Sequence, residues 1–399
     1  MSSRMHSWFD RSSEQPLAPA MLVGLIVTLA GAVIALNQVS PWFSPVLLLI
    51  SIGGIVFVAI RQTSAVPANS SRAREENFSK LGAIDFAQTE QWLKANVRGQ
   101  DEAIEIVISS LRSQVAIAQR GQLLGSFLLV GPTGTGKTFL PQLLAQALYP
   151  DSEPVLLRMN QYKTNNDVQT LLGPPPGMAG YEVGGSLTRP VLVNPKRVVI
   201  LDELEKAHPD LHHCLFDILD SATCREKSSG KEVDFSQCVF FGTSNAGVET
   251  LRTLRQQINP TKDQALWLGQ SRDALVDNAG FDRAFLARWA HIILMDELSP
   301  YHVAEVACLQ LARYWRDYGI ELTYTSPEIL LDTVAKNVEF KQYGVRQLEN
   351  YLKQTTNSAI VQARTSGFRK VRLEAGPNNE LLIQPVLEEE LGASGASLQ

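Results

Sequence analysis

The chain has 399 residues, of which 45% are hydrophobic and 19% are charged, and its formal net charge is −5. This length allows two or three compact units with cores of their own, and the composition excludes a disordered or low-complexity protein. The acidic balance argues against a large nucleic-acid surface, because affinity for phosphate backbones comes from clustered lysine and arginine. We therefore expect no nucleic-acid partner. The four cysteines show no paired spacing, which indicates a reducing compartment.

The amino-terminal segment differs from the rest of the chain, because no charged residue occurs between Glu14 and Arg61. Residues 17–36 and 42–60 are apolar runs that each approach the roughly 20 residues of a membrane-spanning helix. We predict a transmembrane hairpin at 17–61, after a short N-terminus at 1–16. Arginines flank the hairpin and are absent from its turn, so the positive-inside rule places both termini and the rest of the chain in the cytoplasm. The expected location is a membrane such as the bacterial inner membrane; a cleaved signal peptide and a buried core hairpin are the alternatives.

Beyond a polar linker at 62–79, apolar strand-like runs alternate with helical periodicity over residues 80–299. This order predicts an α/β domain with a parallel sheet covered by helices. The expected strands are 127–130, 155–159, 197–201, 239–242 and 291–295. A smaller, mainly helical subdomain is expected at 300–386, closed by short strands at 370–374 and 380–384. The tail at 387–399 is expected to be solvated.

The clearest chemical motif is the run Gly131-Pro132-Thr133-Gly134-Thr135-Gly136-Lys137-Thr138, which follows an apolar run and precedes a periodic one. It has the G-x-x-x-x-G-K-T form of a phosphate-binding loop (P-loop), in which backbone N–H groups face the phosphates at a helix N-terminus. Lys137 is expected to neutralise the β and γ phosphates and Thr138 to bind Mg²⁺. The sequence therefore predicts a nucleotide site, with ATP and Mg²⁺ as cofactors.

Further polar side chains follow later strands. Asp202 and Glu203 end the apolar run 197–201, where Asp202 is placed to hold Mg²⁺ and Glu203 to polarise the attacking water. Asn245 ends the next strand and is placed to orient the same water, although a turn-capping role is equally consistent with the sequence. Arg288 and Arg346 are single cations on helical segments, and each alone is as consistent with a structural role.

The segment 201–210, Leu-Asp-Glu-Leu-Glu-Lys-Ala-His-Pro-Asp, closely resembles the Walker B segment of the Clp-type AAA+ unfoldases. Other motifs of that family occur in order, at 98–103, at 173–182 and at 344–346, so the resemblance covers residues 80–384. It implies an AAA+ P-loop NTPase fold in a single ATPase module similar to the second ATPase domain of the two-domain members. It also implies that Asn245 is sensor 1, Arg346 is sensor 2 and Arg288 is the arginine finger offered to an adjacent subunit. Activity would then require a homo-oligomeric ring, with a hexamer expected.

The resemblance also implies two kinds of contact beyond the phosphates. Val97 and Arg98 would lie beside the adenine, where Arg98 replaces an apolar residue of the family. The loop Gly177-Met178-Ala179-Gly180-Tyr181 would grip a threaded polypeptide. Met178 stands where the family has an aromatic residue, and a thioether is adaptable but less rigid.

A second pore-facing loop is expected at 223–234, a mixed-charge segment with Arg225, Lys227 and Lys231 facing Glu226 and Glu232. No docking loop for a barrel-shaped protease is evident between residues 248 and 278. The histidines after Walker B are expected to be structural rather than metal ligands, since no third ligand accompanies them. They are His208, His212 and His213.

Two functions are consistent with these features. The first is a membrane-anchored ATPase that remodels, unfolds or extracts proteins at the cytoplasmic membrane surface, with protein clients and the lipid bilayer as partners. The second is a non-threading ATPase that assembles or regulates a membrane complex such as a secretion apparatus. A nucleic-acid motor is disfavoured by the acidic charge, and a lumenal location by the arginine distribution.

Overall fold

The computed structural model describes residues 84–117, 122–178, 180–329, 345–376 and 381–386. The described residues all belong to one compact unit, which begins at residue 59. The predicted transmembrane hairpin at 17–61, the linker at 62–79 and the tail at 387–399 lie outside the described residues. Within the described ranges, no helix combines the length and the apolar character needed to cross a bilayer.

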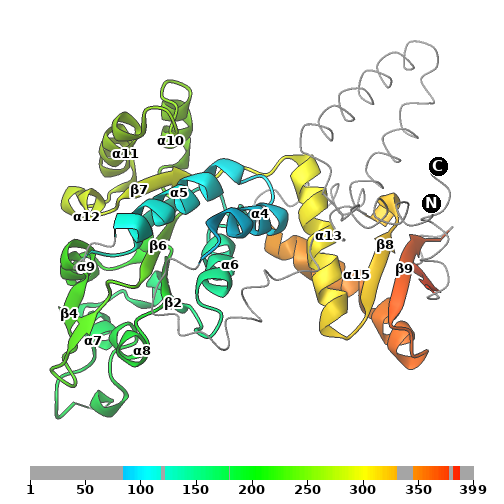
Figure 1. Cartoon of the computed structure of the whole chain (residues 1–399), viewed down its shortest axis with the longest axis horizontal. Helices are drawn as coiled ribbons and strands as arrows, with labels where there is room; N and C mark the ends of the chain where they lie inside the picture. The colour runs from blue at the N-terminus through cyan, green and yellow to red at the C-terminus, as the bar shows by residue number, and fades with distance from the viewer. Residues whose placement is uncertain (1–83, 118–121, 179, 330–344, 377–380, 387–399) are drawn as a thin grey trace, which may run out of the picture. The chain divides into compact units, whose positions relative to one another are not determined.

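A five-stranded sheet with the spatial order β2-β3-β6-β1-β7 forms the centre of the ATPase domain (Figure 1). All of its pairings are parallel, which confirms the predicted α/β class. The predicted strands all occur, with ends shifted by one or two residues. They are β1 (Gly125–Val130), β2 (Val155–Arg158), β3 (Val198–Asp202), β6 (Val239–Ser244) and β7 (His291–Leu294).

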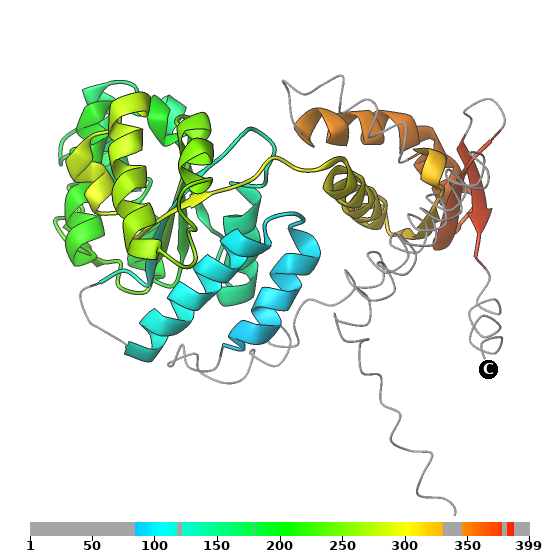
Figure 2. The same ribbon diagram turned by 90° about the horizontal axis from the view of Figure 1, so that it is seen from above.

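Helices cover both faces of this sheet. Successive side chains of a strand point to opposite faces, and both faces carry apolar side chains. In β1, Phe127 and Leu129 pack under one helix layer, whereas Leu128 and Val130 pack under the other. The first layer, on one side of the sheet in Figure 2, consists of α4 (Phe86–Asn96), α5 (Asp101–Ile117) and α6 (Phe139–Leu148). The second layer consists of α7 (Asn165–Leu172), α8 (Thr188–Val193), α9 (Pro209–Ser221), α10 (Val248–Arg255), α11 (Gln264–Ala279) and α12 (Arg283–Ala287).

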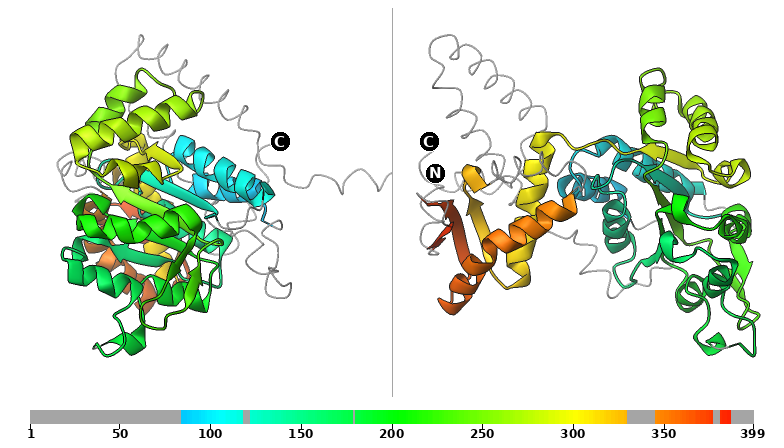
Figure 3. Two further views of the ribbon diagram at one scale, coloured as in Figure 1. Left: turned by 90° about the vertical axis from the view of Figure 1, so that its left-hand side faces the viewer. Right: turned by 180° about the vertical axis from the view of Figure 1, so that it is seen from behind.

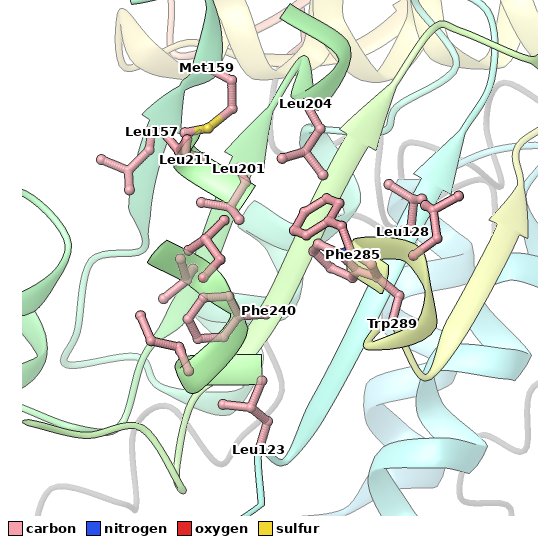
Figure 4. Close-up of a cluster of buried hydrophobic side chains, with 14 of the residues drawn as sticks. Leu123, Leu128, Leu157, Met159, Leu201, Leu204, Leu211, Phe240, Phe285 and Trp289 are labelled. Atoms are coloured by element: carbon pink, nitrogen blue, oxygen red, sulfur yellow. The ribbon is translucent and has the colours of Figure 1, made fainter. Parts of the chain in front are cut away.

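The second layer has the larger core. Leu201, Phe240 and Leu128 from three neighbouring strands meet Phe285 and Trp289 there, as Figure 4 shows. Phe285 and Trp289 are fully buried, and their rings meet edge to face at 5.8 Å. This aromatic packing fixes α12 and the residues after it against the sheet.

Several helices begin at capping signals that the sequence carries. The Ser299 side chain accepts a hydrogen bond from the backbone of His302, and Pro300 follows it at the first position of α13. Thr164 and Asp167 form a capping box at the start of α7. Such caps satisfy backbone N–H groups that have no partner within the helix, so they fix where each helix starts.

The C-terminal region contains a second, smaller sheet. Two helices pack against each other beside it (Figure 3), α13 (Pro300–Asp317) and α15 (Val345–Thr365). The sheet has the order β10-β9-β8, with β8 (Glu321–Thr325) parallel to β9 (Lys370–Ala375) and β10 (Leu381–Pro385) antiparallel to it. The strands β9 and β10 were predicted, but β8 was not. Its alternating Glu-Leu-Thr-Tyr-Thr pattern is the signal that would have identified it.

Candidate nucleotide-binding site

The P-loop, residues 131–138, lies between β1 and the N-terminus of α6. Its entrance is fixed by both neighbouring strands, because the Gly131 N–H donates to the Ser244 carbonyl (3.1 Å) and the Met295 N–H donates to the Val130 carbonyl (2.7 Å). The loop therefore sits at the carboxyl edge of the parallel sheet, next to the ends of β6 and β7. Ligands of open parallel sheets bind at this edge.

Lys137 is held inside this loop. Its side chain is largely buried, and Nζ donates to the carbonyl oxygens of Gly131 (2.8 Å) and Pro132 (2.6 Å). The positive charge thus lies among the loop's backbone groups, where this motif binds phosphate. The structure places Lys137 inside the loop, and its role in neutralising phosphate stays a prediction.

Asp202 joins the P-loop to the ends of two strands. Its Oδ1 atom accepts hydrogen bonds from the hydroxyl groups of Thr138 (2.8 Å) and Thr243 (2.7 Å). The two predicted metal ligands, Thr138 and Asp202, are therefore in direct contact. A hydroxyl and a carboxylate oxygen side by side are ligand types that Mg²⁺ prefers, so these residues fit that ion. When bound, the ion would supply positive charge beside the transferring phosphoryl group.

Glu203 has a strained backbone. Among the described residues, it and Ala222 are the non-glycine residues with positive φ, and its φ is 61°. Its carboxylate accepts hydrogen bonds from Asn160 Nδ2 (3.1 Å) and Lys206 Nζ (2.9 Å). The hydrogen bond to Glu203 raises the pKa of Lys206, despite the opposing effect of burial. Strain of this kind persists only where the surroundings impose it, and it is common at functional sites.

Sequence reasoning missed three residues of this cluster. The Thr243 hydroxyl accepts a hydrogen bond from the Glu203 N–H (3.0 Å) while donating to Asp202, so it orients both acidic residues. Asn160 and Lys206 clamp the Glu203 side chain. A partial signal existed for Thr243 and Asn160, since they end or follow strands that neighbour β3. Lys206 is part of the Walker B segment itself.

Asn245, the predicted sensor 1, lies at the same edge of the sheet. Its side chain is exposed, and its N–H donates to Glu205 Oε1 (3.3 Å). Asn245 lines an open cleft of about 540 Å³ together with Pro132 and Thr133 of the P-loop. The cleft gives the amide access to the P-loop, and its role in orienting water stays a prediction.

Of the two predicted adenine contacts, Val97 lies beside the P-loop. A methyl group built on Gly136 would lie 3.6 Å from Val97 Cγ1. Arg98 has an acidic partner that the sequence did not suggest, because Nη1 lies 3.8 Å from Glu305 Oε1 on α13. Both side chains are largely buried, and Arg98 Nε has no hydrogen-bond partner. Burial raises the pKa of Glu305, while the Arg98 charge opposes that shift.

The two predicted catalytic arginines lie in the later helices. Arg288 follows α12, where Nε donates to Asp220 Oδ2 (2.8 Å) and the guanidinium lies 3.9 Å above the Phe216 ring centre. Both partners belong to α9, so Arg288 is held against the second helix layer. Arg346 lies in the first turn of α15, and its side chain is outside what the structure describes.

The predicted gripping loop carries exposed apolar side chains. The exposed fractions are 53% for Met178, 41% for Tyr181 and 74% for Val183. Gly177 and Gly180 lie in turns with positive φ, and Ala179 is outside the described residues. Val183 was not part of the prediction, and it extends the apolar surface of the loop.

The second predicted loop is a β-hairpin, with β4 (Thr223–Arg225) paired antiparallel to β5 (Glu232–Asp234). The prediction that Glu226 faces the lysines of this segment is wrong. Glu226 is 1% exposed and accepts hydrogen bonds from Gly185, Thr188 and Ser229. A buried carboxylate needs such donors, and two of the three, Gly185 and Thr188, are distant in sequence.

The histidines after Walker B take part in packing and capping. His208 Nδ1 accepts a hydrogen bond from the Asp210 N–H (3.2 Å) at the start of α9. His212 stacks on Phe285 with ring centres 4.1 Å apart, and burial lowers its pKa to about 4. In the described ranges, no group of three or more His, Cys, Asp or Glu residues could hold a metal ion.

Fold and site together define a P-loop nucleotide-binding domain with a strand-end acidic pair. Comparison with known proteins gives the class more closely, since residues 122–292 match the AAA domain (Cdc48 subfamily). The chain is 33% identical over 323 residues to the chaperone protein ClpB of Vibrio cholerae, covering 78% of this chain and 35% of that protein. For ClpB of Malacoplasma penetrans the identity is 30% over 279 residues, covering 68% and 37%.

The chain therefore spans roughly a third of the length of these curated relatives. The AAA-domain match includes both the P-loop and the strand-end pair of Asp202 and Glu203.

Proposed function

We propose that this chain is the motor of an ATP-driven machine that remodels or unfolds proteins. One observation carries the proposal: the ATPase domain presents Met178, Tyr181 and Val183 as exposed apolar side chains on a single short loop. Apolar side chains exposed together mark a site of protein contact, and methionine adapts to varied partners. The similarity to proteins named chaperone protein ClpB supports the same proposed function.

The working unit proposed here is a homo-oligomeric ring, with six subunits expected. Arg288 would complete the ATP site of the neighbouring subunit, Asn245 would orient the attacking water and Arg346 would act as sensor 2. Mg²⁺ would bind at Thr138 and Asp202. Contacts of Arg288 with α9, on a helix layer of the ATPase domain, support an arginine that acts outside its own P-loop.

The test is capture of clients by a Glu203→Gln variant, which should bind ATP and fail to hydrolyse it. A photo-crosslinker replacing Met178 should then link to client polypeptide only when ATP is present. As a matched control, the same crosslinker at exposed Leu266 on α11 should give no client adduct. Equal labelling from both positions would contradict client contact through the loop.

A second candidate function, the non-threading assembly or regulatory ATPase, is favoured by Met178 itself. A methionine offers less rigid contact area than the aromatic residue that threading enzymes of this type carry at this position. If Met178→Ala leaves client remodelling unchanged while Glu203→Gln abolishes it, the loop does not grip and the assembly function is preferred. A fall in remodelling with unchanged ATPase activity supports gripping.

We also propose that residues 17–61 anchor the ATPase domain to the cytoplasmic face of a membrane. Support comes from the sequence alone, which has no charge from residue 15 to residue 60 and arginines only outside this segment. Alkaline extraction of membranes tests the anchor. The full chain should remain in the membrane pellet, and release into the supernatant would contradict anchoring by this hairpin.

A further inference from the structure

Two loops of the ATPase domain meet beside α8. The first, here called the crest loop, comprises residues 173–185 without residue 179, and it carries the exposed Met178, Tyr181 and Val183. The second, the hairpin turn, comprises residues 226–231 between β4 and β5. The Lys227 N–H donates to the Leu172 carbonyl (2.9 Å), directly before the crest loop. The hairpin turn thus holds the point where the crest loop leaves α7.

A second bond reinforces the same end of the crest loop. The Ser228 hydroxyl donates to the Pro174 carbonyl (2.7 Å). Gly173 has a φ of +92°, and a methyl group built on it would lie 2.3 Å from Ser228 Oγ. Only glycine allows both this backbone conformation and this approach of the serine.

Glu226 fastens the other end of the crest loop. Its Oε1 atom accepts hydrogen bonds from the Gly185 N–H (3.2 Å) and the Thr188 hydroxyl (3.1 Å). The Ser229 hydroxyl, in the hairpin turn, donates to Oε2. The carboxylate is 1% exposed, and a buried charge is stable only with such donors.

The charge state of Glu226 agrees with this arrangement. Burial tends to raise its pKa, but hydrogen bonds from Ser229, Gly185 and Thr188 and the nearby Arg189 charge lower it overall. The carboxylate is therefore ionised, which makes its bonds to the crest loop charge-assisted. Bonds of this kind are roughly twice as strong as neutral ones.

The hairpin turn is also connected to the nucleotide site along the chain. Glu203 and Lys206 lead into α9, α9 leads directly into β4, and β4 ends at the residue before Glu226. The base of the hairpin is closed by the Phe235 N–H, which donates to the Ala222 carbonyl (2.7 Å). One continuous set of ordered elements thus runs from Glu203 to Glu226.

We propose that Glu226 is a positioning residue that joins the crest loop and the hairpin turn into one unit. The apolar side chains of the crest loop then move with α9 and the hairpin when the nucleotide site changes state. Assigning client contact to the crest loop rests on the proposed function, whereas the joining of the two loops does not.

Hydrogen exchange of the full chain, measured without client, tests the joined unit. Glu226→Ala removes the acceptor for Gly185 and Thr188, so the crest loop should exchange about ten- to hundredfold faster. Glu232→Gln, an exposed acid on the same hairpin, is the matched control and should leave the crest loop unchanged. Faster exchange in the hairpin turn alone, with an unchanged crest loop, would overturn the proposal.

Two further variants keep the test decisive. If Glu226→Ala also accelerates exchange in α10 and α11, the milder Ser228→Ala replaces it, and the crest loop must still exchange faster. Glu226→Asp should restore part of the protection. If the crest loop keeps its protection from hydrogen exchange in both the Ser228→Ala and the Glu226→Ala variants, the joined unit is contradicted.

Activity measurements separate this proposal from the proposed function. Glu226→Ala should keep basal ATP turnover within about twofold, because the strand-end residues are untouched, yet lose client processing. If exchange changes as expected and the unaltered protein processes no client, the proposed function fails and the joined unit stands. If Glu226→Ala loosens the crest loop and client processing is nevertheless unchanged, the joined unit does not position the crest loop for client contact.

Discussion

The two polar groups that the sequence assigns to one ATP site have different surroundings. The strand-end group, Thr138, Asp202, Glu203 and Thr243, is linked by hydrogen bonds within a single chain. Arg288 is instead held by Asp220 and Phe216 on α9. The residues proposed for the phosphate and metal side of the site thus come together within one chain. Arg288, the cation proposed to complete the site of another copy, is positioned separately from them.

Arg288→Ala has the largest expected effect on ATP turnover, and mixing variant subunits tests its cause. Arg288→Ala should retain ATP binding and lower turnover by about 10³- to 10⁵-fold, as loss of an arginine finger does. Mixing it with Glu203→Gln should restore part of the turnover, because the Glu203→Gln subunit supplies Arg288 to a neighbour with intact Glu203. Turnover by the mixture is measured against each variant alone.

The contrary result is as informative. If the two variants form mixed rings, detected by native mass spectrometry, and turnover stays at the level of each alone, Arg288 acts within its own chain. The proposal that Arg288 serves a neighbouring subunit would then be wrong. Arg283→Ala, an exposed arginine at the start of α12, which Arg288 follows, is the control and should leave turnover unchanged.

Thr243→Val tests the strand-end group with a smaller expected effect. Valine keeps the shape and removes the hydroxyl that joins Asp202 to the Glu203 N–H. A buried hydrogen bond to a charged group contributes about 1.5–3 kcal/mol, so turnover should fall about ten- to hundredfold. Thr243→Ser should restore turnover. Wild-type single-turnover rates in Thr243→Val would show that the hydroxyl does not orient the acidic pair.

Asp220→Asn tests how far turnover depends on the ion pair that holds Arg288 against α9. Asp220 is half exposed, so its ion pair with Arg288 is worth little, and stacking on Phe216 remains. We expect steady-state turnover of the assembled ring to fall about two- to fivefold, with ATP affinity unchanged. Asp217→Asn on the same helix is the control. A fall as large as that of Arg288→Ala would mean that Asp220 contacts the reaction directly.

The sequence predicts contacts best where the chemistry depends on a local spacing. The P-loop, the strand-end position of Asp202 and the order of the strands' polar ends follow from short patterns. Partners such as Thr243 and Asn160 depend on which strands are neighbours, and that order is a tertiary property. Glu226 shows the limit. Its charged neighbours in sequence indicated a solvated segment, while two of its three hydrogen-bond partners, Gly185 and Thr188, lie about forty residues away.

The last prediction concerns stability and not turnover: it is the pH dependence of unfolding on the side of the molecule that holds Arg288. His212 of α9 stacks on Phe285 of α12, is 8% exposed and has no hydrogen-bond partner at Nε2. Burial lowers its folded pKa to about 4, although Asp282 tends to raise it. The ring is therefore neutral in the folded protein across the neutral range.

In the unfolded chain the His212 ring takes up a proton more readily, because an unperturbed histidine has a pKa of about 6.5. Acidification from pH 7 should thus lower the free energy of unfolding between about pH 6.5 and pH 4, by on the order of 3 kcal/mol at full extent. His212→Phe keeps the stacking and should flatten this part of the pH profile in denaturant unfolding. His213→Gln, an exposed neighbour, should not. An equally steep profile in His212→Phe would show that other groups destabilise the protein in acid and that α9 and α12 are not held together through a neutral imidazole.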